Sequence, residues 1–214
     1  MNPKLVKPAL AELLGTFILV FIGAAAVVSA AGSGGVVTAA FGHGLVLVGI
    51  IFAFGHISGG HFNPAVTLAM LIAGKVDLMK AVYYWIAQFV GAIVAGLLIK
   101  GLLGFAGPAT GTLTSDAVWT AAIFEAVVTF IFVSVIFQTA AFGKAGNLAP
   151  VAIGFTLAAC IFAAGPFTGG SLNPARTFGP ALASGDLSYF IPYFVGIFGG
   201  AALAALVQTR LLND

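Results

Sequence analysis

Six long apolar segments dominate the chain and limit what it can fold into. They cover about residues 9–31, 36–55, 79–103, 117–142, 147–165 and 188–211, with glycine-rich or proline-containing separators between them. A helix needs roughly 20 apolar residues to cross the hydrocarbon core of a bilayer, and each segment is close to that length or longer. Only 7% of the residues are charged, whereas a soluble domain carries roughly 25%. The sequence therefore predicts an all-α integral membrane protein with six transmembrane helices.

Two further apolar stretches are too short to be spans. Residues 63–74 and 173–183 are each about a dozen residues long, a length typical of re-entrant segments. Each follows a polar, glycine-rich approach, which contains Gly59-Gly60 in the first case and Gly169-Gly170 in the second. We therefore expect two re-entrant half-helices that enter the membrane and turn back.

Basic residues are distributed unevenly about these segments. With a cytoplasmic N-terminus, the cytoplasmic ends and loops hold Lys4, Lys7, Lys75, Lys80, Lys144 and Arg210. The external loops around the re-entrant segment hold Asp116 and Asp186 but no lysine or arginine, which is the positive-inside pattern. We therefore expect a multi-pass protein in the lipid bilayer of the cell (plasma) membrane, with both termini cytoplasmic. Lys100, near the outer end of the third span, is expected to extend its ammonium group to the interface. The net charge of +2 favours no nucleic-acid partner.

The two halves of the chain resemble each other. Residues 59–67 align with residues 169–177, an offset of 110, and Phe89-Val90-Gly91 matches Phe194-Val195-Gly196. Each half, about 9–103 and 117–211, contains three spans, so the repeats must run in opposite directions through the membrane. Inverted repeats that meet at short helices indicate a solute pathway near the midplane, within a single domain of residues 1–214.

Two glutamates lie within spans, where ionisable groups are rare and costly. Glu12 and Glu125 both occur in a Glu-x-x-x-Thr pattern, each near the membrane face at which one re-entrant segment enters. Non-helical backbone at membrane depth needs hydrogen-bond partners. We therefore interpret both carboxylates as anchors that accept N–H groups of the re-entrant loops; the alternative is that each sits at a hydrated helix end.

The tripeptide Asn-Pro-Ala occurs twice, each time after a Gly-Gly pair. Asparagine caps helix N-termini, and proline suits the first helical position, where its missing N–H would have no partner anyway. The copies are Asn63-Pro64-Ala65 and Asn173-Pro174-Ala175. With this duplicated motif, essentially the whole chain resembles the aquaporin (major intrinsic protein) family of channels, and in particular its water-channel type.

The resemblance implies six tilted helices with two half-helices that meet end to end, as one channel domain. The amides of Asn63 and Asn173 would donate hydrogen bonds to a passing water, while the positive ends of the half-helices repel cations. Backbone carbonyls would line the rest of the path, at Gly59, Gly60, His61, Phe62, Gly169, Gly170, Ser171 and Leu172. The resemblance also implies a homotetramer with one pore per subunit.

The family's outer constriction falls on His43, Ile161, Gly170 and Arg176. Arg176 would be a permanent cation that bars charged species; a bland alternative for His43 is a hydrogen-bonded core histidine. The His-Ile-Gly-Arg set is similar to that of a subgroup of plant tonoplast intrinsic proteins associated with water and ammonia.

The resemblance implies a passive channel for water, and for ammonia or other small neutral solutes, that excludes ions and protons. Thr177 and Ala181 match water-type relatives, whereas Pro192 is typical of glycerol channels, so a small-polyol facilitator is the alternative. An ion-coupled secondary transporter would need acidic groups at a coupling site, and only Glu12 and Glu125 lie within spans. No cofactor, metal site or enzyme activity is expected, because no cluster of metal ligands or nucleophile–base pair occurs.

Overall fold

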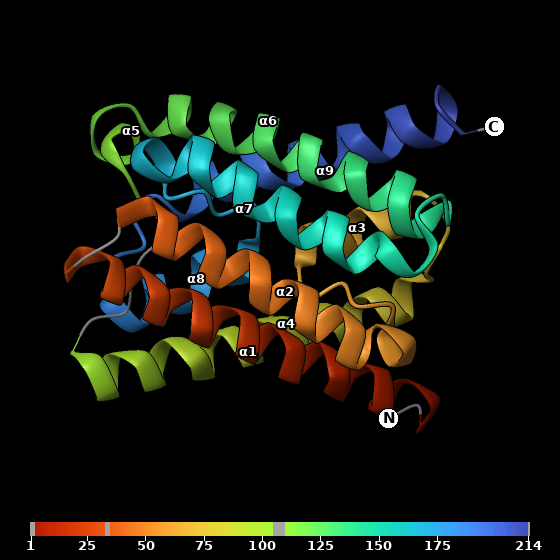
Figure 1. Cartoon of the computed structure of the whole chain (residues 1–214), viewed down its shortest axis with the longest axis horizontal. Coiled ribbons are helices and arrows are strands. Elements are labelled where there is room, and N and C mark those ends of the chain that lie inside the picture. The colour runs from red at the N-terminus through yellow and green to blue at the C-terminus, as the bar shows by residue number, and fades with distance from the viewer. Residues whose placement is uncertain (1–2, 33–34, 105–109, 214) are drawn as a thin grey trace.

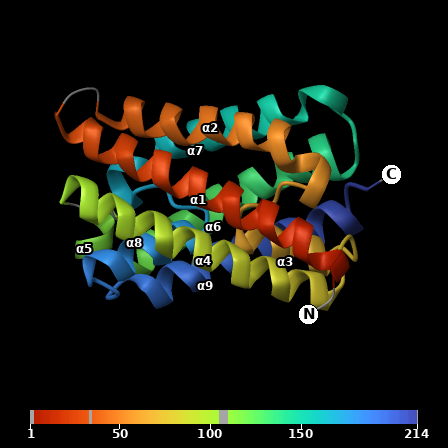
Figure 2. The ribbon, with the colours of Figure 1, turned by 90° about the horizontal axis from the view of Figure 1, so that it is seen from below.

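The computed structural model describes residues 3–32, 35–104 and 110–213, and it is helical throughout its regular segments. Six long helices lie side by side (Figures 1 and 2). They are α1 (Pro3–Gly32), α2 (Gly35–Ser58), α4 (Leu78–Leu103), α6 (Val118–Ile136), α7 (Ala149–Thr168) and α9 (Phe190–Arg210). All six are long and apolar enough to cross a membrane, in the case of α6 and α7 with the short turns that flank them. The predicted six-span fold is confirmed.

The remaining elements are short. The half-helices α3 (Pro64–Ile72) and α8 (Pro174–Ser184) follow the two Asn residues of the repeated motif, as predicted. A helical turn, α5 (Thr112–Asp116), lies in a loop for which the sequence predicted no element. A π-helical turn (Phe137–Ala141) and a 3₁₀ turn (Gly146–Leu148) flank the connection from α6 to α7.

Two helix boundaries differ from the sequence-based expectation because prolines lie inside helices. The first helix was expected to begin at about residue 9, but α1 begins at Pro3 and contains Pro8. The fifth span was expected to end before Gly165-Pro166, but α7 continues to Thr168. A proline removes only one backbone hydrogen bond, and α7 ends instead where Gly169 adopts a left-handed conformation, with φ at 82°.

The two halves pack through their half-helices. Helices α1, α2 and α4 pack together, as do α6, α7 and α9, and α2 contacts α7 between the halves. Each half-helix crosses over, because α3 packs mainly on α9 and α8 mainly on α4. Helix α1 begins and α9 ends on the same side of the bundle (Figure 1), as an even number of spans requires.

Close helix contacts fix the register between the halves. A Cβ on Gly91 of α4 would overlap the Leu13 carbonyl oxygen of α1, and one on Gly200 of α9 would overlap the Ala126 carbonyl oxygen of α6. Leu13 and Ala126 each follow one of the two intramembrane glutamates, so Gly200 is the counterpart of Gly91. The sequence match to Gly196 was therefore displaced by about one helical turn, because glycine occurs at both positions.

Lys100 does not simply extend to the membrane interface as expected. Its ammonium group donates to the Ala183 carbonyl oxygen at 2.6 Å, in the last turn of α8. The final carbonyls of a helix carry partial negative charge, so a cation stabilises this end of the half-helix.

We expect Gly91→Ala to destabilise the protein by about 2 kcal/mol, because the new methyl group meets backbone that cannot move without separating α1 from α4. Gly101→Ala is the matched control, since the same helix presents open space at that position. It should be neutral or stabilising by up to about 1 kcal/mol. Thermal unfolding in detergent measures both, and equal melting temperatures would contradict the proposed close contact.

Candidate functional site

The half-helices α3 and α8 begin at two asparagines in extended backbone conformation. The side-chain oxygen of Asn63 accepts the Ala65 N–H at 2.8 Å, and that of Asn173 accepts the Ala175 N–H at 3.0 Å. In both cases proline occupies the first helical position. Because the carboxamide oxygen is used as the cap, the amide group of each side chain must point away from its own helix.

Each amide group reaches across to the opposite half of the chain. Asn63 donates to the Leu172 carbonyl at 2.8 Å, and Asn173 donates to the Phe62 carbonyl at 2.9 Å. These reciprocal bonds hold the two helix N-termini face to face. Each NH₂ group retains a second hydrogen, and each carbonyl a second lone pair, for a solute. The sequence did not predict that these two carbonyls also join the halves.

The loops that lead into the half-helices share an uncommon backbone. In the first, φ is 97° at Gly59, 67° at Gly60 and 48° at Phe62. The second repeats the pattern at the positions 110 residues later: Gly169 (82°), Gly170 (57°) and Leu172 (54°). Glycine accepts such angles readily, but a non-glycine residue does so at a cost that neighbouring contacts must offset.

Glu12 makes contacts that offset this cost in the first loop. Its carboxylate, fully buried, accepts the N–H groups of His61 at 3.0 Å and Phe62 at 2.6 Å. The Gln88 side-chain amide donates to the same carboxylate at 2.7 Å and also to the Thr67 hydroxyl at 3.0 Å. One carboxylate therefore satisfies the N–H group of the strained residue and that of its neighbour.

Glu125 occupies the equivalent place in the second loop. It accepts the N–H groups of Ser171 and Leu172, each at 2.8 Å. Its third donor is the Thr168 hydroxyl at 2.6 Å, where the first half uses Gln88. Both glutamates thus contact the loops that the sequence associated with them.

Further supporting groups were missed at the sequence level. Tyr84 donates its hydroxyl to the Ser58 carbonyl at 2.6 Å, and Tyr193 donates to the Thr168 carbonyl at 2.7 Å. The hydroxyls of Ser58 and Thr168 in turn accept the N–H groups of Gly60 and Gly170. The repeated hydroxyl residue directly before each Gly-Gly pair was the signal that could have indicated these bonds.

Arg176 lies at the outer end of the site with an ordered side chain. Its Nε donates to His43 Nε2 at 2.9 Å, and its Nη2 donates to the Gly169 carbonyl at 3.2 Å. Because arginine can only donate, His43 Nε2 must accept, so the imidazole proton lies on Nδ1 and is donated to the Ala39 carbonyl at 2.8 Å. The buried Nη1 has no hydrogen-bond partner among the described residues, which leaves it available to a solute.

Small residues make room for this arrangement. A Cβ on Gly23 of α1 would overlap the His43 imidazole. A Cβ on Gly170 would lie 3.1 Å from the Cα of Ile161, so these two residues are in direct contact. The structure therefore brings His43 and Arg176 together, and Ile161 and Gly170 together; the role of Gly23 had no sequence signal.

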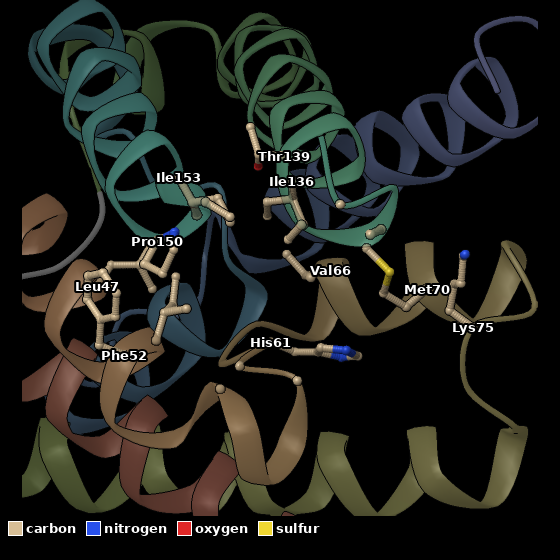
Figure 3. Close-up of a pocket in the computed structure, with 18 of the residues that line it drawn as sticks. Leu47, Phe52, His61, Val66, Met70, Lys75, Ile136, Thr139, Pro150 and Ile153 are labelled. Carbon is tan, nitrogen blue, oxygen red and sulfur yellow. The ribbon is translucent and has the colours of Figure 1, made fainter. Parts of the chain in front are cut away.

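Three hollows lie in line through the bundle. The central cavity is only about 20 Å³ and is lined by His43, Asn63, Asn173 and Arg176, among others. An outer vestibule of about 340 Å³ includes Ile161, Gly169 and Arg176. An inner vestibule of about 490 Å³ opens on the side where α1 begins, and includes Gly59, Gly60 and His61 (Figure 3).

A narrow polar centre between two wide mouths, held by paired re-entrant helices, defines a channel of the aquaporin class. The family model for the major intrinsic protein family matches residues 1–208. The chain therefore belongs to the major intrinsic protein family, whose members are passive membrane channels for water and small solutes and are not enzymes. It is accordingly a multi-pass membrane protein.

Individual relatives agree with this assignment. The chain is 44% identical to Aquaporin TIP2-3 of Arabidopsis thaliana over 94% of its length and 85% of the relative's. It is 40% identical to Probable aquaporin TIP1-2 of Oryza sativa subsp. japonica over 96% and 86%. Among solved structures, it is similar to the aquaglyceroporin from Plasmodium falciparum, with a TM-score of 0.87 and 26% identity over 98% of this chain and 97% of that one.

We expect Glu12→Ala and Glu125→Ala to lower folded yield and thermal stability. Each substitution leaves buried N–H donors unpaired, at roughly 1–3 kcal/mol for each donor. Asp116→Ala, at an exposed carboxylate in the outer loop, is the control and should have little effect. Normal melting temperatures together with a changed solute preference would show that the glutamates act on the solute rather than on the loops.

Proposed function

We propose that water crosses the protein in single file through the central cavity, between Asn63 and Asn173. The observation that carries this proposal is the pair of facing amides in a cavity of about 20 Å³. A cavity needs roughly 10–15 Å³ to hold one water, so there is room for about one molecule at a time. The amide hydrogens that remain can donate to its oxygen, which favours acceptance of both hydrogen bonds from the asparagines.

Exclusion of ions and protons is assigned to Arg176 and to the two half-helices. The guanidinium group borders both the central cavity and the outer vestibule, so every solute must pass it. The N-termini of α3 and α8 also face the cavity with the positive ends of their dipoles. A cation would therefore lose its hydration shell in the place where positive charge is concentrated.

We assign the outer selection of solutes to His43, Ile161, Gly170 and Arg176, with ammonia as a second permeant molecule. Ile161 gives this ring one wall that cannot form hydrogen bonds, so a solute that is weakly hydrated gains relative to water. The small central cavity supports water and ammonia over glycerol. The carbonyls of the two loops, from Gly59 to Phe62 and from Gly169 to Leu172, are proposed as acceptors along the path.

The whole chain is proposed as one channel domain of two inverted repeats, about 9–103 and 117–211. Matching hydrogen bonds in the two loops support this division. We also propose that both termini face the cytoplasm, since the basic ends and loops lie on the side where α1 begins (Figure 1). A homotetramer in the cell membrane, with one pore in each subunit, is proposed from membership of the family.

Proteoliposomes test conduction and exclusion together. The wild-type protein should accelerate osmotic shrinkage, measured by stopped-flow light scattering, without raising proton or ammonium-ion conductance. Arg176→Val should retain water flux and admit protons or cations, because it removes the fixed charge and widens the ring. Wild-type vesicles that shrink no faster than empty ones would overturn the proposed function, and an Arg176→Val protein that still excludes ions would remove Arg176 from the filter.

We expect Ile161→His to lower ammonia flux more than water flux. The new imidazole narrows the ring and replaces its apolar wall with a group that favours water. The ratio of ammonia to water permeability, measured on the same vesicles by internal pH and by light scattering, should fall severalfold. An unchanged ratio, or a native preference for glycerol, would contradict this interpretation of the ring.

A further inference from the structure

The inverted repeat gives each residue of the outer ring a counterpart in the other half. An offset of 110 residues relates His43 to Ile153 and Arg176 to Val66. It likewise relates Ile161 to Ile51 and Gly170 to Gly60. The histidine and arginine of one ring are thus replaced in the other by isoleucine and valine.

Helix contacts support this register in α2 and α7. A Cβ on Gly44 would meet the Gly154 carbonyl and the Ala158 side chain, and a Cβ on Gly154 would meet the Gly44 carbonyl and the Val48 side chain. Gly44 and Gly154 are 110 residues apart, as are Val48 and Ala158. The two helices therefore cross symmetrically with the same offset as the loops.

All four counterparts line the inner vestibule: Ile51, Gly60, Val66 and Ile153. At this depth the inner half of the path is wide and apolar, since the vestibule measures about 490 Å³. In Figure 3, Ile153 lies on the opposite side of the pocket from His61. The inner side therefore carries no copy of the outer ring at the equivalent level.

The inner path narrows one step deeper. Leu47, His61 and Phe132 line both the inner vestibule and the central cavity, so the passage between the two hollows runs between these side chains. Their counterparts at the outer end of the cavity are smaller in two cases: Ser171 for His61, and Leu19 for Phe132. Bulk is thus added to the outer half at the ring and to the inner half at this passage.

His61 is the polar member of the passage. Its Nδ1 is engaged with the Thr67 hydroxyl at 3.0 Å, which fixes the ring and leaves Nε2 for a solute. Leu47 and Phe132 offer no hydrogen bonds, and both are nearly fully buried. A solute must therefore give up its other waters here, as it does again at Arg176.

We propose that Leu47, His61 and Phe132 form an inner constriction that acts in series with the outer ring as a second determinant of solute size. This inference rests on the proposed function, because it concerns the same path. When two barriers lie in series, the slower one sets the flux. Widening either end alone then changes the passage of a larger neutral solute little, whereas widening both ends releases it.

Urea permeability of proteoliposomes tests this with His43→Ala at the outer ring and Phe132→Ala at the inner constriction. We expect each single variant to stay within about twofold of the wild type, and the double variant to exceed both by about tenfold. Leu47→Ala in place of Phe132→Ala should give the same pattern, which covers the case in which one variant folds poorly. Water flux and a single elution peak establish that each variant is folded.

Val133→Ala is the matched control, because Val133 is a buried neighbour of Phe132 on α6 that lines neither hollow. Added to His43→Ala, it should leave urea flux unchanged. If His43→Ala alone reaches the flux of the double variants, the inner constriction does not limit solutes and the inference is wrong. A wild-type protein without water flux would instead overturn the proposed function itself.

Discussion

Everything in this channel depends on satisfying irregular backbone in the middle of a membrane. Two loops enter the bundle in left-handed conformations, at Phe62 and Leu172 even without glycine, and no bulk water is available to bind their N–H groups. One buried carboxylate from each half accepts two of those groups. A charged acceptor suits this task because it binds several donors more strongly than a neutral one does. The cost of burying each glutamate is offset by the loop that it holds.

The loops in turn position the asparagines. Once Glu12 and Glu125 fix the backbone, each asparagine uses its oxygen to cap one half-helix and one amide hydrogen to hold the opposite loop. The remaining hydrogen therefore has only one direction left, toward the cavity. Polar function at the centre is a consequence of structural bonds that occupy every alternative. Symmetry holds here because the same groups do the same work in both halves.

Toward the mouths the symmetry is broken, and selection depends on the differences. Outside the cavity, Arg176 and His43 hold each other in place through a single hydrogen bond, while the inner counterparts Val66 and Ile153 leave a wide apolar vestibule. Deeper on the inner side, larger side chains meet than on the outer side. A repeat supplies the same backbone twice, and substitutions at equivalent positions then give each end its own chemistry.

Much of this could be predicted from the sequence because local patterns carry it. The six spans follow from apolar length, and the half-helices follow from Asn-Pro at their starts. Where prediction failed, short-range signals competed with packing: α7 continues through Pro166, and the Ala183 carbonyl binds Lys100. The match of Gly91 to Gly196 failed similarly, since two glycines one turn apart are equivalent until a neighbouring helix distinguishes them.

The sequence by itself therefore determined the membrane fold, the duplicated motif and the residue types of the outer ring. Only the tertiary structure decided which donor meets which acceptor, for instance that Gln88 supports Glu12 while Thr168 supports Glu125. It also decided that Leu47, His61 and Phe132, from three separate segments, border one passage. The physical reason is that spans and caps arise from interactions among residues near in the chain. A pore wall is made by side chains far apart in it, and their meeting depends on how the helices cross.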